Sequence, residues 1–232
     1  MEIYVPHYER TALSAIDMAE LNALLDKAIE DERSGCLNKL NLSSCGSHVG
    51  GRLHAFERAL LSYRQAKSAR KRDEAGTYLQ SVKHELSFSV RAMQQRVKQE
   101  EQDEQFFFVQ GESMPPYGFG ERLTAKVRFR WRRSIEDDWS ASSITFVHNV
   151  DPFARRLLLA PKRKLSARKQ EEEYQEQLSD TWEYLMTGAL YSVRDYFRQG
   201  GDGGTIPEIF DAKPGSAGHL NNNSTVFWTK NT

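Results

Sequence analysis

The feature that most constrains the fold is a stretch in which apolar and basic residues alternate. Between Glu121 and Arg133 the sequence reads ERLTAKVRFRWRR. The apolar positions are Leu123, Ala125, Val127, Phe129 and Trp131, and the basic positions between them are Lys126, Arg128, Arg130 and Arg132. Because successive side chains of a β-strand point to opposite faces, this pattern predicts a strand with one apolar face and one cationic face.

The residues that follow predict a hairpin partner for this strand. A turn is expected over residues 134–139 and a second strand over residues 143–150, paired antiparallel because the connection is short. In that strand Ile144, Phe146 and His148 share the core face, whereas Ser143, Thr145 and Val147 share the other. Outside the hairpin, the continuously apolar run 106–109 predicts a strand covered on both faces. Further strands are predicted over residues 153–160 and 224–228.

Apolar residues at helical spacing dominate the first half of the chain. They predict three helices, over about residues 13–32, 53–72 and 73–99, of which the last two can also form one long helix. Residues 1–12 are expected to be extended, and residues 36–51, rich in Ser, Asn and Gly, are expected to form a loop. Much later, an apolar stripe from Tyr174 to Phe197 predicts a long helix over residues 166–198, and a short turn is expected after Pro207.

Together these elements predict an α+β protein. A helical subdomain of three helices is expected over residues 1–104, followed over residues 105–232 by an antiparallel sheet of three to five strands, the long helix 166–198 and a polar C-terminal tail. The 39% hydrophobic and 28% charged fractions are ordinary for a globular domain. No signal pattern and no apolar run of membrane-spanning length is present in the sequence, so a cytoplasmic protein without membrane contact is predicted.

The charge of the chain is unevenly distributed, although its formal net charge is zero. From Glu121 to Lys169 there are thirteen Lys and Arg residues against five Asp and Glu residues. This local excess predicts an anionic partner, and the leading hypothesis is a non-enzymatic protein that grips the nucleic-acid backbone, DNA or RNA, with weak sequence preference. The contacts are assigned to Lys126, Arg128, Arg130 and Arg132, with Arg133, Arg155, Arg156, Lys162, Arg163 and Lys164 as auxiliary residues. Because the aromatic residues of the hairpin are expected on its core face, backbone contact is favoured over base stacking.

Three alternatives compete with this hypothesis. The arginines can pair internally with carboxylates of residues 171–176 or of the first helix, or they can dock an acidic surface of a protein partner, which makes the protein an adaptor or inhibitor. The third alternative is an enzyme acting on a phosphate-bearing substrate, for which His148 and Asp137 are the residues to nominate. No nucleophile and base stand at a spacing that favours catalysis. The glycines of 200–204 are expected to end a helix rather than to cradle a phosphate.

One cluster contains residue types that bind metal. Cys36, Cys45, His48 and His54 follow the order of two thiolates and two imidazoles, which suits tetrahedral zinc. Eight residues separate the cysteines, however, whereas two to four are usual in zinc fingers. Two reduced thiols in a loop are therefore favoured, no cofactor is predicted, and zinc is the alternative.

Overall fold

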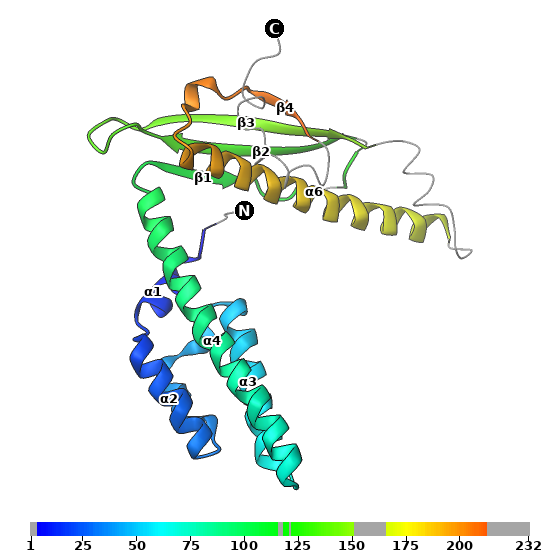
Figure 1. The fold of residues 1–232 in the computed structure, drawn as a ribbon. Helices are drawn as coiled ribbons and strands as arrows, with labels where there is room; N and C mark the ends of the chain where they lie inside the picture. The colour runs from blue at the N-terminus through cyan, green and yellow to red at the C-terminus, as the bar shows by residue number, and fades with distance from the viewer. Residues whose placement is uncertain (1–3, 116–117, 121, 151–165, 213–232) are drawn as a thin grey trace. The chain divides into compact units, whose positions relative to one another are not determined.

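The computed structural model describes residues 4–115, 118–120, 122–150 and 166–212. These residues combine helices with a β-sheet, which confirms the predicted α+β class (Figure 1). The chain divides into two compact units, which we call the helical unit (residues 4–102) and the sheet unit (from Asp103 onward). None of the helices in the described ranges combines the length and the apolar character needed to cross a bilayer.

The described part of the helical unit contains four α-helices, where three were expected. They are α1 (His7–Ser14), α2 (Met18–Glu30), α3 (Ser47–Gln65) and α4 (Ala69–Asp103), and two short 3₁₀ helices, η1 (Ser34–Leu40) and η2 (Leu42–Ser44), connect α2 to α3. The extended conformation expected for residues 1–12 is wrong from His7 onward, because a helix there places Leu13 fully in the core. The break between the last two helices lies at residues 66–68 rather than near Arg72.

The segment expected to be a loop, residues 36–51, is largely helical. Gly50 and Gly51 lie inside α3, although glycine in a helix interior costs about 1 kcal/mol relative to alanine. Val49 and Phe56, two turns apart on α3, are both fully buried. Burial of two such side chains contributes about 1.5–3 kcal/mol each, which exceeds the cost of about 2 kcal/mol for two glycines, so packing overrides local propensity here.

A buried carboxylate holds the start of the chain against α4 in the helical unit. The side chain of Glu100 is fully buried, and it accepts hydrogen bonds from the Val5 N–H at 2.6 Å, Arg96 Nε at 2.9 Å and Arg10 Nη2 at 3.4 Å. Two guanidinium groups and a backbone donor therefore compensate the desolvation of this charge.

The two cysteines of the helical unit are free thiols in different surroundings. Cys45 is fully buried in the core, and desolvation, assisted by the Glu9 carboxylate, raises the pKa of its thiol to about 11. Cys36 is only half-buried, with its Sγ atom 3.4 Å from the carbonyl oxygen of Leu24.

These surroundings predict different reactivities for the two thiols. At pH 8 only about one Cys45 in a thousand is a thiolate, so alkylation of Cys45 in the native protein should be at least about 100-fold slower than alkylation of Cys36. Mass spectrometry of timed reactions measures both rates, with Cys36→Ser and Cys45→Ala variants to identify each site. Denaturant should make the rates similar, and equal rates in the native protein would contradict the burial of Cys45.

The raised pKa of Cys45 also predicts how stability depends on pH. Because the pKa of this thiol is higher in the folded state than in the unfolded state, the free energy of unfolding should fall as the pH rises from about 8.5 to about 11. This effect should be absent from Cys45→Ala.

The described residues of the sheet unit form a four-stranded sheet with the order β1-β2-β3-β4. Its strands are β1 (Phe107–Gly111), β2 (Arg122–Trp131), β3 (Ser140–Asn149) and β4 (Ile209–Asp211). The first three are antiparallel, as predicted, but β4 pairs parallel to β3 and forms where a short turn was expected. The long helix α6 (Ala167–Arg198) lies between β3 and β4 in the chain, and a connection of that length permits parallel pairing. A short 3₁₀ helix, η3 (Gly203–Thr205), precedes β4.

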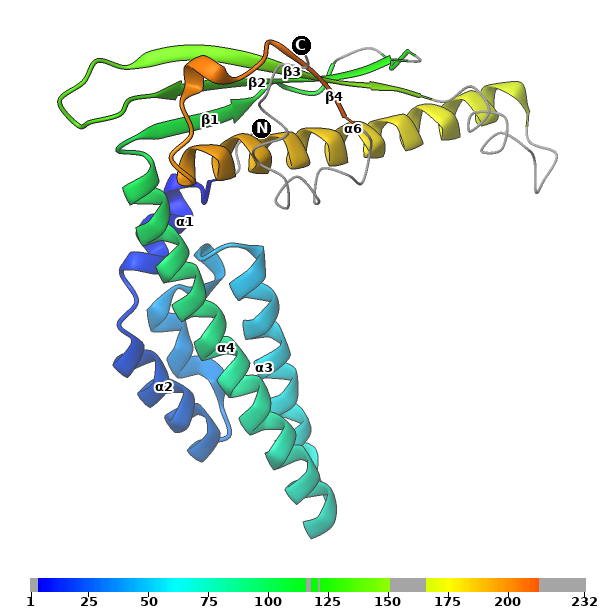
Figure 2. The same cartoon turned by 45° about the horizontal axis from the view of Figure 1, so that its top comes forward.

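Helix α6 covers one face of the sheet, as Figure 2 shows. It begins at the capping residue Ser166 and ends before Gly200, whose φ of 82° is the left-handed conformation that glycine adopts without steric cost. Its Trp182 indole donates a hydrogen bond to the Thr124 carbonyl oxygen at 2.7 Å, and its Phe197 ring lies 5.4 Å from the rings of Phe107 and Phe129. The apolar face of β2 is thus buried under α6, as the alternation predicted.

A second buried ion pair lies within the sheet unit. Asp103 and Arg194 are 5% and 2% exposed, and Arg194 Nη2 lies 3.2 Å from an Asp103 carboxylate oxygen. Arg198, which is less buried, approaches the same oxygen at 2.7 Å. Removal of the carboxylate would take a partner charge away from the buried Arg194 guanidinium, which is the costly way to break such a pair.

Candidate nucleic-acid interface

On the outer face of the sheet, away from α6, three successive outward positions of β2 carry basic side chains. These are Lys126, Arg128 and Arg130, which are exposed, whereas Val127 and Phe129 between them are buried. The pairing of β2 with β1 and β3 determines which residues lie beside these cations. Lys126 pairs with Thr145, Arg128 lies between Gln110 and Ser143, and Arg130 lies between Phe108 and Ala141. We call the surface formed by these eight residues the basic face.

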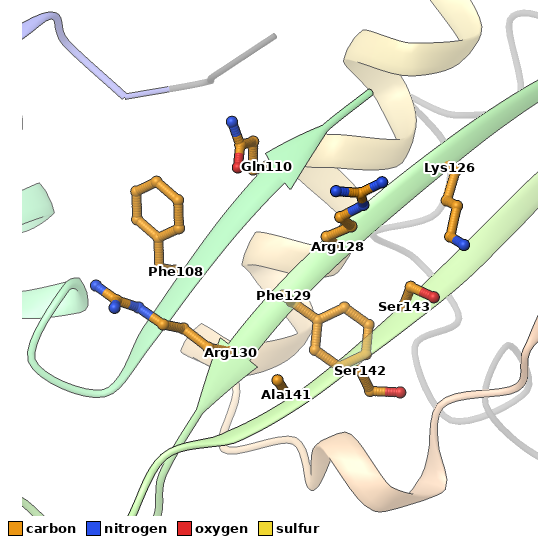
Figure 3. A pocket seen from close by; sticks show the side chains of 9 residues that line it. All are labelled: Phe108, Gln110, Lys126, Arg128, Phe129, Arg130, Ala141, Ser142 and Ser143. Atoms are coloured by element: carbon orange, nitrogen blue, oxygen red, sulfur yellow. The ribbon is translucent and has the colours of Figure 1, made fainter. Parts of the chain in front are cut away.

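The basic face is hollowed by a shallow depression of about 570 Å³ that is open to solvent (Figure 3). Its walls come from β1, β2 and β3, with Phe108 and Gln110 on the β1 side, Ser143 on the β3 side and the row of cations between them. Enclosed pockets for small ligands bury most of the ligand surface. An open trough across three strands instead suits an extended ligand that lies along the sheet.

The three cations of the row have no ion-pair partner within the described ranges. Of the carboxylates expected as internal partners, those of residues 171–176 lie on α6, where Glu172 pairs with Arg168 at 2.8 Å and Glu171 accepts a hydrogen bond from Gln175 at 3.0 Å. In the first predicted helix, Asp26 pairs with Lys83. At the edge of the face, a Glu112 carboxylate oxygen accepts the backbone N–H of Lys126 at 3.1 Å.

The two arginines at the end of the hairpin strand have structural contacts instead. Arg132 donates from Nε to the Gln105 carbonyl oxygen at 2.7 Å and from Nη1 to the Ile135 carbonyl oxygen at 2.6 Å. Arg133 forms an ion pair with Asp202. A hydrogen bond from the Gly204 N–H, together with this guanidinium, lowers the pKa of the Asp202 carboxyl. Of the four cations predicted to form the row, three therefore face solvent, whereas Arg132 and the auxiliary Arg133 form contacts that hold the end of the hairpin.

The aromatic residues of the hairpin strands face the core, as predicted, with Phe129 and Phe146 buried, but aromatic rings from outside these two strands lie on the outer side. The Arg130 guanidinium lies 5.3 Å from the ring centre of Phe108 and 4.7 Å from that of Trp139, and the Arg132 guanidinium lies 4.6 Å from Trp139. Trp139, in the turn between β2 and β3, is 38% exposed. The prediction that residues 106–109 form a strand covered on both faces is wrong. In the described sheet β1 is an edge strand, with Phe107 and Val109 buried and Phe108 on the outer face.

The remaining predicted basic contacts cannot be placed. Arg155, Arg156, Lys162, Arg163 and Lys164 lie outside the described residues, as do the strands predicted over 153–160 and 224–228.

The four residues considered for zinc do not gather into a group of ligands in the described part of the chain. Cys45 lies in the apolar core, and Cys36 contacts a backbone carbonyl. His48 and His54 are six residues apart on α3, so they do not share a face of that helix. Within the described ranges no three His, Cys, Asp or Glu side chains gather as metal ligands, and zinc at these residues stays a prediction.

The residues nominated for catalysis have contacts typical of structural roles. His148 Nδ1 lies 3.1 Å from the Ala212 carbonyl oxygen, which ties β3 to the residue after β4. An Asp137 carboxylate oxygen accepts the Ser134 N–H at 2.8 Å, a hydrogen bond typical of Asp in turns.

Comparison with protein-family models, with curated proteins and with solved structures finds no match to this chain. Its function is therefore inferred from the geometry of the basic face.

Proposed function

We propose that the sheet unit binds nucleic acid through the phosphate backbone, with the basic face as the contact surface. The observation that supports this is the row of Lys126, Arg128 and Arg130, exposed and without ion-pair partners in the described part of the chain. A guanidinium group can form two parallel hydrogen bonds with a phosphate, so each arginine suits one phosphate group. The hydroxyls of Ser143 and Thr145 lie beside the row as further donors.

The dimensions of the row suit a chain of phosphates rather than a single anion. Alternate residues of a strand are about 6.6 Å apart, so the three cations extend over about 13 Å. Contacts with the backbone carry little sequence information, which agrees with the weak sequence preference of the hypothesis. As part of the same proposal, the protein acts in the cytoplasm, where the thiols of Cys36 and Cys45 stay reduced, and it catalyses no reaction.

The salt dependence of binding tests this proposal. If three phosphates of a single strand are neutralised, the logarithm of the association constant should fall against the logarithm of salt concentration with a slope of about −2. Fluorescence anisotropy with labelled DNA and RNA oligonucleotides measures this slope. Arg128→Gln should make the slope less steep by about 0.7.

The matched control is Arg168→Gln, which removes an exposed arginine from α6, the helix on the other side of the sheet. It should leave the slope and the affinity unchanged. A wild-type affinity that does not vary with salt, or an equal effect of both variants, would count against the basic face as a phosphate-binding surface.

An acidic protein surface is the alternative partner for the same cations. Pull-down from lysate treated with nuclease separates the two possibilities, because a protein partner survives the treatment. A specific acidic protein retained by the wild type but not by Arg128→Gln, with no affinity for oligonucleotides, would replace the proposed function.

A further inference from the structure

We infer that the ligand is single-stranded and that one of its bases stacks on the rings of Phe108 and Trp139, beside Arg130. This inference depends on the proposed function and specifies its ligand. It departs from the expectation drawn from the sequence, in which backbone contact is favoured over base stacking.

The cluster that supports this inference lies at one end of the row of cations. Arg130 contacts both aromatic rings, at 5.3 and 4.7 Å from their centres, and Arg132 contacts the Trp139 ring as well. Arg132 is in turn fixed by two backbone carbonyl oxygens, so the position of its guanidinium beside Trp139 is defined. Aromatic rings and guanidinium planes are the surfaces on which proteins stack unpaired bases. The cluster offers such planes on the solvent side of the sheet.

The position of the cluster relative to the cations suits a nucleotide strand. Phe108 pairs with Arg130 across the sheet, and Arg128 is the next outward residue along β2, about 6.6 Å farther. A base on the Phe108 ring therefore leaves its neighbouring phosphates near Arg128 and Lys126. Gln110, the next outward residue of β1, pairs with Arg128 and offers an amide donor and acceptor to the edge of a stacked base (Figure 3).

A duplex does not fit this arrangement equally well. Its bases are stacked on one another inside, so a duplex presents phosphates to the row of cations but no base face to Phe108 and Trp139. A free mononucleotide can use the cluster but engages only part of the row. The combination of stacking planes at one end and cations over about 13 Å selects a single strand.

The test is a double variant, Phe108→Leu with Trp139→Leu, assayed with three ligands of equal length: a single strand, an abasic single strand and a duplex. Affinity for the normal single strand should fall by roughly 5- to 150-fold per stacked base. Affinity for the abasic strand and the duplex should stay unchanged, and the salt slope should stay near −2 because the cations remain. A mononucleotide should compete far more weakly than the oligonucleotide.

Two further variants keep this result interpretable. Tyr184→Leu removes a side chain that is 75% exposed on α6 and should change nothing. Phe108→Tyr with Trp139→Phe keeps an aromatic ring at both positions and should bind the single strand as tightly as the wild type. This result would attribute the loss in the leucine variant to the missing rings.

The outcomes separate this inference from the proposed function. Unchanged single-strand affinity in the leucine variant, an equal loss for all three ligands, or a mononucleotide that competes as well as the strand would overturn base stacking while the salt-dependent binding persists. Absence of salt-dependent binding by the wild-type protein to any of the three ligands would overturn the proposed function itself.

Discussion

A variant in which Lys126, Arg128 and Arg130 are all changed to glutamate is expected to lose about 1000-fold or more in affinity for single-stranded nucleic acid. Each substitution removes a charge-assisted contact, for which about 1.5–3 kcal/mol is typical, and places a negative charge where a phosphate would bind. All three side chains are exposed on the outer face, so the inner packing against α6 should be retained. Anisotropy at fixed ionic strength measures the loss, and circular dichroism confirms the fold.

A matched control changes the net charge of the protein by the same amount elsewhere. Arg64, Lys67 and Lys71 are exposed in the helical unit, and their replacement by glutamate also changes the charge by six units. Affinity should fall only slightly in this control, as expected for the long-range effect of net charge. An equal loss in both triple variants would mean that binding responds to overall charge and not to the basic face.

Asp103→Ala is expected to lower the free energy of unfolding of the sheet unit by about 3–5 kcal/mol. The substitution leaves Arg194 buried without the carboxylate that now compensates its charge, and it removes a partner of Arg198 as well. None of the four tryptophans, at positions 131, 139, 182 and 228, belongs to the helical unit, and Trp131, Trp139 and Trp182 lie in the described part of the sheet unit. Tryptophan fluorescence during denaturant titration therefore reports the unfolding of that unit.

An exposed ion pair on α6, the helix that carries Arg194, provides the comparison for Asp103. Arg168→Ala removes one partner of the Arg168–Glu172 pair and should cost no more than about 0.5 kcal/mol. Combining Asp103→Leu with Arg194→Met should recover part of the stability lost in Asp103→Ala, because no unpaired charge then remains in the core. A loss below about 1 kcal/mol in Asp103→Ala would show that water reaches Arg194 and that the pair is not desolvated.

The strand β2 could be predicted from the sequence almost residue by residue. One face of β2 packs against α6 and the other faces solvent. Apolar and polar residues therefore alternate along the strand with a period of two, which is visible in the sequence. The long helix α6 was predicted with the same accuracy, because a single stripe of apolar residues from Tyr174 to Phe197 faces the sheet. Both elements have one buried side and one exposed side over their whole length.

The predictions of secondary structure and burial are wrong where the sequence does not distinguish a buried side from an exposed side. A continuous apolar run such as 106–109 does not reveal which residues face outward, so Phe108 was assigned to the core. Glycines at 50 and 51 suggested a loop, yet the core contacts of Val49 and Phe56 favour helix. The parallel pairing of β4 depends on where α6 returns the chain, which is a property of the whole sheet unit.

The division of the cations could not be predicted either. Arg132 is held by the carbonyl oxygens of Gln105 and Ile135, and Arg133 is held by Asp202, 69 positions away in sequence. Only the folded chain brings these acceptors to the end of the hairpin. Arg128 follows the same alternation as Arg132, but its neighbours on the adjacent strands are Gln110 and Ser143.

In β2, odd-numbered and even-numbered positions have different roles. Odd positions from Leu123 to Phe129 fix the fold, whereas even positions from Thr124 to Arg130 meet solvent. Under the proposed function, a substitution at an even position alters what the protein binds and spares its folding, so binding can be redesigned, or can drift, on an unchanged scaffold.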